Sequence, residues 1–149
     1  MFKNILVPTD GSLQSQKAAG QAIALAKSLG AKVTGFFAAP PATPVVYDDY
    51  LPVGFAQPLE HAKMIKAAAA KHLGFIENAA KKARVSFEGV HVTSDFPADD
   101  ILKIAGKKKC DLIVMATHSK GGLRGMFVGS ITQKVLNQSK IPVMVFRNG

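Results

Sequence analysis

A glycine-rich segment in the last third of the sequence has the residue types that bind phosphate. It runs from Lys120 to Ser130 and contains four glycines, the cations Lys120 and Arg124, and the start of a predicted helix at its far end. A helix N-terminus offers unpaired amide groups and a partial positive charge, and glycines let a phosphate approach the backbone closely. The segment therefore predicts a phosphate-binding loop.

Two common phosphate-binding motifs are absent from the sequence. There is no Gly-x4-Gly-Lys-Ser/Thr pattern, and no Gly-x-Gly-x2-Gly follows the first predicted strand. The first pattern defines the P-loop, and the second defines the dinucleotide-binding turn. The sequence thus excludes the generic form of either site.

The histidines offer little further chemistry. His118 lies beside the loop, but no candidate nucleophile and orienting carboxylate surround it in the sequence, so we interpret it as a structural or ligand-packing residue. His61 and His72 are eleven residues apart on one predicted helix. That spacing is about 16 Å along the axis, too far to share a metal ion. His91 falls in a predicted edge strand, where we expect it to be solvated, and no metal site is predicted.

Cys110 is the only cysteine, so the chain cannot form an internal disulfide. This agrees with a reducing compartment. Three lysines precede Cys110 and would lower the pKa of a nearby thiol, which makes a reactive cysteine one interpretation. The other, which we favour, is a plain position just before a buried strand.

Length and composition predict one globular unit. With 149 residues and 48% apolar residues the chain can build a full hydrophobic core, so we expect a single domain over residues 1–149. No window approaches twenty uninterrupted apolar residues, and the start runs directly into a strand pattern rather than a signal peptide. We therefore expect a cytoplasmic protein with no membrane partner.

The charge balance favours anionic partners. Nineteen Lys and Arg against ten Asp and Glu leave a formal net charge of +9, which attracts phosphates, anionic ligands or acidic surfaces. Several of the lysines fall at predicted helix ends, where they complement the terminal carbonyls. There is no tryptophan, and the phenylalanines lie mostly in strand-like runs, so the cations lack interleaved aromatic residues. Nucleic acid is not expected as the primary ligand.

Strand and helix patterns alternate along the chain. Apolar runs predict strands over residues 2–7, 32–38, 86–92, 111–116 and 142–146, and apolar spacings of three and four predict helices between them. The first helix is expected between the N-cap Ser12 and the stop at Gly30, and the others over residues 58–83, 97–105 and 130–138. This alternation predicts an α/β fold: an open, doubly wound, parallel five-stranded sheet, order 3-2-1-4-5, with helices on both faces.

Three segments have a special place in this expected fold. The strand over residues 86–92 is less apolar than the others and suits a sheet edge, whereas residues 111–116 are nearly all apolar and suit a strand buried on both faces. Residues 40–58 form an irregular, proline-rich stretch that is long enough to be a lid or a partner surface. The sequence does not choose between these two roles.

The expected ligand position follows from the strand order. In an open parallel sheet, ligands bind outside the carboxyl ends of the strands, where the strand order reverses. With the order 3-2-1-4-5 the first and fourth strands flank this point. Their carboxyl ends carry Pro-Thr-Asp-Gly-Ser at residues 8–12 on one side, and Ala-Thr-His-Ser at residues 116–119 on the other.

Four separated blocks of the sequence resemble the universal stress protein family. In order, they are Lys-Asn-Ile-Leu-Val-Pro-Thr-Asp-Gly-Ser at residues 3–12, Asp-Leu-Ile-Val-Met-Ala-Thr-His at residues 111–118, Val-Gly-Ser at residues 128–130 and Ile-Pro-Val-Met-Val at residues 141–145. The resemblance covers essentially the whole chain. It implies a five-stranded α/β fold and a homodimer paired through the last strand, which begins at Pro142 and ends at Phe146.

Nucleotide-binding members of the family carry the motif Gly-x2-Gly-x9-Gly-Ser/Thr. The matching positions here are Ala116, Ser119, Gly129 and Ser130, so the spacing is intact and the first two glycines are replaced by small residues. The resemblance therefore implies ATP or a related adenine nucleotide as the ligand, with Mg²⁺ only as a companion of the nucleotide.

The same resemblance assigns roles to individual residues. Asp10 would face the ribose or adenine, Ala38 would offer a backbone contact to the base, and Ser119, Gly129 and Ser130 would hold phosphates. The nucleotide-binding set is completed by Pro8, Thr9, Met115, Ala116, His118, Ile131 and Thr132. From their position alone, Lys120 and Arg124 would add positive charge near the phosphates.

Simpler interpretations stay open for the two central residues. Ser130 begins Ser-Ile-Thr-Gln, a capping box in which its hydroxyl would only satisfy the helix end. Asp10 would likewise have a structural role only, as a residue that stabilises the turn into the first helix.

Three functional hypotheses remain at this stage. The leading one is a dimeric stress protein that binds an adenine nucleotide and hydrolyses it slowly if at all, because no general base or carboxylate cluster accompanies the predicted phosphate site. The second is a dimeric interaction protein that does not bind nucleotide. The third is a small-molecule enzyme that depends on His118 or Asp10.

Overall fold

The structure is a computed structural model that describes residues 1–40, 58–117 and 129–147. Its elements in chain order are β1 (Asn4–Thr9), α1 (Leu13–Leu29), β2 (Lys32–Ala39), α2 (Pro58–Ala83), β3 (Phe87–Thr93), α3 (Pro97–Lys107), β4 (Leu112–Ala116), α4 (Ser130–Gln138) and β5 (Val143–Phe146). These are the strands and helices that the sequence predicts, with bounds that differ by one or two residues at most ends.

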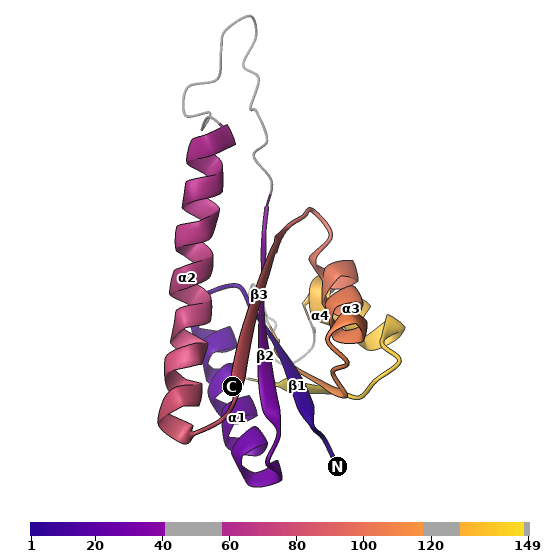
Figure 1. Cartoon of the computed structure of the whole chain (residues 1–149). Helices are drawn as coiled ribbons and strands as arrows, with labels where there is room; N and C mark the ends of the chain where they lie inside the picture. Colours follow the sequence, from indigo (N-terminus) through magenta and orange to yellow (C-terminus); the bar gives the residue numbers. More distant parts are fainter. Residues whose placement is uncertain (41–57, 118–128, 148–149) are drawn as a thin grey trace, which may run out of the picture.

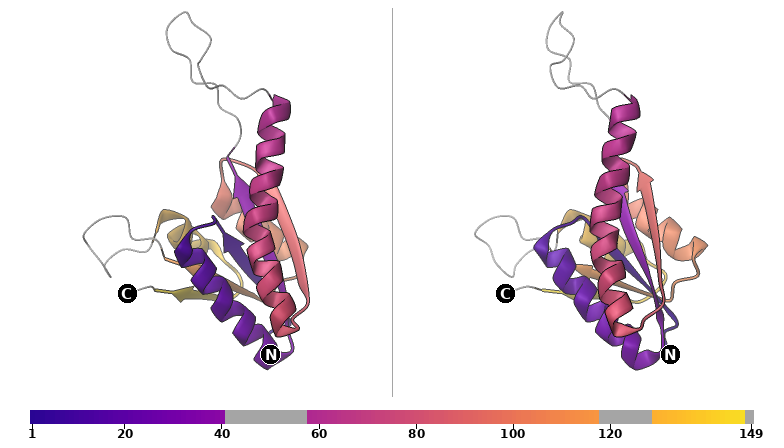
Figure 2. Two further views of the ribbon diagram at one scale, coloured as in Figure 1. Left: turned by 90° about the vertical axis from the view of Figure 1, so that its left-hand side faces the viewer. Right: turned by 60° about the vertical axis from the view of Figure 1, so that its left-hand side comes forward.

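The five strands form one parallel sheet in the order β3-β2-β1-β4-β5, as predicted. Helices α1 and α2 pack on one face of the sheet, and α3 and α4 pack on the other (Figures 1 and 2). The fold class and the strand order are therefore confirmed. The predicted edge position of β3 is confirmed as well.

The central strands supply both halves of the hydrophobic core, because successive side chains of a strand point to opposite faces. In β1, Ile5 and Val7 join the cluster under α1 and α2, whereas Leu6 joins the cluster under α3 and α4. In β4, Val114 and Ile113 divide between the two clusters in the same way. All five residues of β4 are buried, so the prediction of a strand buried on both faces is confirmed.

Proline 8 lies inside β1, although the sequence pattern predicted that the strand would end before it. Pro8 is paired with Phe36 of β2, and this ladder continues to Thr9. On its other side β1 pairs with β4 only through Ile5 and Leu6. A proline has no N–H to donate and is tolerated where a strand is paired on one side only. The ladder of β1 with β4 thus stops before β1 itself ends.

Three helices end in the same backbone arrangement at the amino end of the sheet. Gly30 follows α1 with φ +66°, while Arg84 follows α2 with φ 59° and Lys109 follows α3 with φ 54°. In each case the amides of this residue and the next donate to carbonyls of the last helical turn. Glycine adopts this left-handed conformation freely, whereas for L-residues the conformation costs about 1–2 kcal/mol. The sequence pattern predicted only the glycine.

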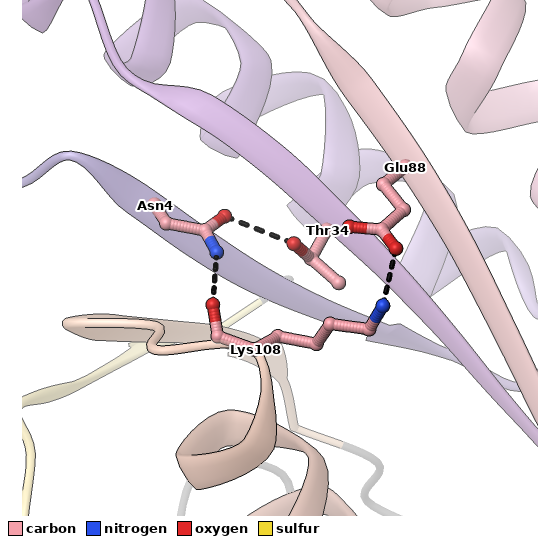
Figure 3. A network of polar contacts seen from close by, with 4 residues as sticks. All are labelled: Asn4, Thr34, Glu88 and Lys108. Carbon is pink, nitrogen blue, oxygen red and sulfur yellow. Dashed lines mark hydrogen bonds and ion pairs between the residues drawn. The ribbon is translucent and has the colours of Figure 1, made fainter.

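A buried asparagine ties three elements together near the start of β1 (Figure 3). Asn4 is 3% exposed. Its Nδ2 donates to the carbonyl of Lys108 after α3 (3.0 Å), and its Oδ1 accepts from the Thr34 hydroxyl of β2 (2.9 Å). The ammonium of Lys108 pairs in turn with Glu88 of β3, and this contact lowers the pKa of the Glu88 carboxyl below its usual value.

We predict that Thr34→Val destabilises the protein by about 1–3 kcal/mol, because it leaves the Asn4 Oδ1 buried without its donor. Thr93→Val on β3 is the matched control, since Thr93 is exposed. It should change the free energy of unfolding by less than about 0.5 kcal/mol. Urea unfolding of both variants measures the difference. A Thr34→Val protein as stable as the control would show that the Asn4 contact contributes nothing.

Candidate functional site

The site predicted from the strand order lies where β1 and β4 part. After β1 the chain enters α1 on one face of the sheet, whereas α4 lies on the opposite face (Figure 2). This reversal opens a crevice outside the carboxyl ends of the two strands. Because the ladder between β1 and β4 stops at Leu6, the last residues of β1 have no strand beside them on the crevice side.

A cavity of about 150 Å³ occupies this position. Its lining includes eight residues that the sequence predicted for a nucleotide site: Pro8, Thr9, Asp10, Ala38, Met115, Ala116, Ile131 and Thr132. They come from β1, β2, β4 and the first turn of α4. The structure therefore gathers around one cavity residues that are up to 124 positions apart in the sequence.

Four more lining residues were not predicted: Ser15, Phe36, Pro97 and Ile101. Phe36 could have been found, because it is two residues before Ala38 and alternate residues of a strand share a face. Ser15 lies one helical turn after the N-cap Ser12. Pro97 and Ile101 lie in the N-terminal half of α3, and no local sequence pattern indicates that this helix reaches the cavity.

The turn from β1 into α1 is held by short polar contacts. The Thr9 hydroxyl lies 3.0 Å from the Ser15 hydroxyl and accepts the Gly11 amide at 3.1 Å. Oδ1 of Asp10 accepts the Ser12 amide at 2.9 Å. The turn-forming role considered for Asp10 is thus present. It coexists with the position of Asp10 in the cavity wall.

A histidine of α2 packs directly against this turn. Gly11 has φ +82°, and a Cβ atom added to it would lie 2.2 Å from Cε1 of the His72 ring. The same ring lies 5.2 Å from the ring of Phe37 in β2. Only glycine fits between α2 and this end of β1, so α2 limits where the β1–α1 turn can lie.

The start of α4 differs from its predicted capping box. Gly129, not Ser130, is the N-cap residue, and Ser130 is the first residue of the helix. The Gln133 amide donates to the Gly129 carbonyl at 2.8 Å. The alternative interpretation, in which the Ser130 hydroxyl only caps the helix, is therefore wrong. Because its cap is a glycine, α4 has no cap side chain to accept hydrogen bonds from the amides of its first turn.

Strand β4 and helix α4 are joined beside the cavity. The Thr132 hydroxyl donates to the carbonyl of Ala116 at 3.1 Å, and Thr132 is buried. Ala116 ends β4 and is not among the described residues with positive φ. Alanine therefore occupies this position of the motif without the backbone strain that a glycine-specific position would impose.

Several predicted residues lie outside the described part of the chain. They are His118, Ser119, Lys120 and Arg124 of the loop, together with most of the proline-rich segment at 40–58. Gly129 and Ser130 are described and stand directly before the cavity residues Ile131 and Thr132.

The remaining candidates for chemistry do not belong to the cavity. Cys110 is buried, and burial raises the pKa of its thiol, so the reactive-thiol interpretation is wrong. His91 is exposed on the edge strand β3, as predicted. Within residues 1–40, 58–117 and 129–147 no three His, Cys, Asp or Glu side chains are grouped so that they could hold a metal ion.

Comparison with known sequences identifies the family. The model of the universal stress protein family matches residues 1–147. A universal stress protein of Methanocaldococcus jannaschii, MJ0531, is 34% identical over 99% of this chain and 83% of its own length. One from Thermus aquaticus is 32% identical over 99% of this chain and its full length. The chain belongs to the universal stress protein family.

Solved structures share the fold. The M. jannaschii protein MJ0577 superposes with a TM-score of 0.78 at 22% identity, covering 100% of this chain and 98% of that one. The Archaeoglobus fulgidus universal stress protein in complex with dAMP gives 0.68 at 18% identity, with 96% of each chain covered. An Arabidopsis thaliana family member with AMP bound gives 0.64 at 17% identity, over 99% of this chain and 92% of that one.

We predict that Gly11→Ala destabilises the protein by more than about 2 kcal/mol, because it adds both positive-φ strain and a clash with His72. Gly20→Ala is the matched control. Gly20 is exposed in α1 with no atom near an added Cβ, so this change should stabilise the protein by about 0.5–1 kcal/mol. Thermal unfolding compares the two, and equal melting temperatures would contradict the prediction.

Proposed function

We propose that this universal stress protein binds an adenine nucleotide in the cavity between the carboxyl ends of β1 and β4, and acts in the stress response through that occupancy. The observation that carries the proposal is the convergence of eight residues predicted for a nucleotide site on one cavity beside the glycine-capped start of α4.

The cavity wall suits a nucleoside. Phe36, Ala38 and Met115 offer apolar surface for the flat base. In this proposal the Ala38 backbone contacts the polar edge of the base. Asp10 is the one carboxylate among the described lining residues, and in this proposal it accepts hydrogen bonds from the ribose hydroxyls.

The start of α4 suits the phosphates. Gly129 leaves the first amides of the helix without a cap side chain, and the partial positive charge of the helix end favours an anion there. In this proposal Ser130 adds its hydroxyl, and Ser119, Lys120 and Arg124 contribute from the loop that precedes the helix.

The comparisons support the class of ligand. The Archaeoglobus fulgidus and Arabidopsis thaliana proteins are seen with dAMP and AMP, which share an adenine and one phosphate. We extend this class to ATP, with any Mg²⁺ carried by its phosphates. Fast hydrolysis is not part of the proposal, because Asp10 already accepts the Ser12 amide and no second carboxylate lines the described cavity.

The decisive experiment is a calorimetric titration of wild type and Gly129→Asp with AMP, ATP and adenosine. Aspartate is a good N-cap residue, so the variant should be at least as stable as wild type. Its carboxylate takes the amides that a phosphate would use. We expect AMP and ATP to bind wild type saturably, and Gly129→Asp to weaken both at least about tenfold while adenosine binding changes less than about twofold.

Gly129→Asn is the matched control, since it caps the helix without adding a charge. Its affinity for AMP and ATP should lie between those of wild type and Gly129→Asp. If Gly129→Asp lost affinity for adenosine and AMP equally, the phosphates would not bind at the start of α4. No saturable binding of any nucleotide to wild type at millimolar concentration would refute the proposal and leave the interaction-protein hypothesis.

We also propose that two chains, each a single domain, pair through β5 as a homodimer. β5 is an edge strand of the sheet, and its Met144 side chain is 37% exposed. A lysine on an edge strand opposes pairing with a second strand. Light scattering should give a dimer for wild type and a monomer for Met144→Lys at micromolar concentration.

Met64→Lys on α2 is the control for this change, because Met64 is 63% exposed and lies away from β5. The control should remain a dimer. A monomeric wild type at 100-fold higher concentration, or a Met144→Lys dimer as tight as the control, would contradict pairing through β5.

A further inference from the structure

A second hollow lies at the opposite end of the sheet from the proposed nucleotide cavity. It measures about 490 Å³ and is lined by four cationic residues, Lys3, Lys27, Lys32 and Arg84, with small and apolar residues between them. They come from the starts of β1 and β2 and the ends of α1 and α2, which meet near the N-terminus in Figure 1.

None of these four cations forms an ion pair with a carboxylate in the described part of the chain. The ion pairs there join Lys108 to Glu88 and Lys134 to Asp99. The carboxylate of Asp111, at the start of β4, is occupied by the backbone amides of Lys3 and Asn4. Four like charges therefore share one hollow whose described lining includes no carboxylate, and of the four Lys32 acts on an acidic group outside it, Glu88.

The helix ends alone do not account for this arrangement. Carbonyls in the last turn of α2 already accept the amides of Arg84 and Val85, and α1 ends in the same way at Gly30. No cation is needed to satisfy them. Arg84 moreover has φ 59°, a conformation in which glycine would be unstrained. Arg84 thus carries its charge at a position where glycine would be less strained.

The backbone beneath the cations is held in place. The amide of Lys32 donates to the carbonyl of Lys3 at 3.0 Å, and the amide of Val33 donates to the carbonyl of Ser86 at 2.9 Å. These bonds fix the starts of three neighbouring strands relative to one another. The backbone that carries Lys3 and Lys32 is consequently part of the hydrogen-bonded sheet framework.

We propose that this hollow binds a condensed phosphate, a short linear chain of phosphate groups with several negative charges. Four cations in one hollow match a ligand of high charge density. The residues that line it include no aromatic side chain, so nucleobases would find no stacking surface there. The proposal is independent of nucleotide binding at the other end of the sheet.

The test is a titration of the purified full chain with sodium tripolyphosphate at low ionic strength. Arg84→Gly removes a charge and relieves the backbone, so the variant should fold and melt at least as high as wild type. We expect it to weaken tripolyphosphate binding about threefold to fivefold, and Lys27→Gln combined with Arg84→Gly to weaken it more. Raising the salt concentration should weaken binding to wild type.

Two controls separate charge in the hollow from other effects. Lys109→Gly relieves the same left-handed conformation outside the hollow lining, and Lys66→Gln removes an exposed charge from α2. These controls are compared with wild type in about 0.1 M salt, where the Debye length is about 10 Å. Each should then keep the wild-type affinity within about twofold, because neither residue lines the hollow. Arg84→Lys should retain most of the affinity.

Three results would overturn the proposal. The first is equal loss of affinity in Arg84→Gly and Lys109→Gly, which would indicate attraction by net charge alone. The second is binding of orthophosphate as tight as that of tripolyphosphate. The third is tighter binding of a single-stranded oligothymidylate of equal charge, which would make nucleic acid the ligand. Gly129→Asp should leave tripolyphosphate binding unchanged, so failure here and failure of the nucleotide site are distinguishable.

Discussion

The hydrogen-bonded ladder between β1 and β4 is the constraint on which the site depends. β1 is buried on both faces, so it must lie in the middle of the sheet, yet its ladder with β4 stops at Leu6 while its ladder with β2 continues to Thr9. The last residues of β1 therefore face a crevice instead of a strand. Pro8 has no backbone N–H, so on this unpaired side β1 has one fewer donor left without a hydrogen bond. The cavity forms in the space that the missing ladder leaves.

The two ends of the sheet are built for different tasks. At the amino end, Asn4 and Asp111 join the strand starts to one another and to the end of α3, and α1, α2 and α3 close with the same capping bonds. At the carboxyl end, polar side chains such as Thr9 and Thr132 hold the turns around a cavity instead of filling it. A tightly bonded end can support a site at the open end, because the residues that line the site keep their positions when no ligand is present.

The glycine positions of the family motif differ in what the local structure requires of them. At Ala116 the backbone is that of a strand, so a methyl group is accommodated in the cavity wall. At Gly129 the residue is the N-cap of α4, where a side chain with an oxygen would take the amides that an anion needs. Gly11, which is not part of that motif, is the position where both space and backbone conformation demand glycine, because α2 places His72 against it.

The sequence by itself determined the fold class, the order of strands and helices, and eight of the cavity residues. The fold class and the order of elements follow from local periodicity, from turn residues such as Gly30, and from the rule that parallel strands place their carboxyl ends together. Cavity residues such as Ala38, Ile131 and Thr132 came from the resemblance of the sequence to the family. Only the tertiary structure decided that Ser15, Phe36, Pro97 and Ile101 complete the wall, that Gly129 caps α4, and that Cys110 is buried with a raised pKa. Each of these depends on which helix packs against which strand, and such contacts between distant segments leave no periodic trace in the chain.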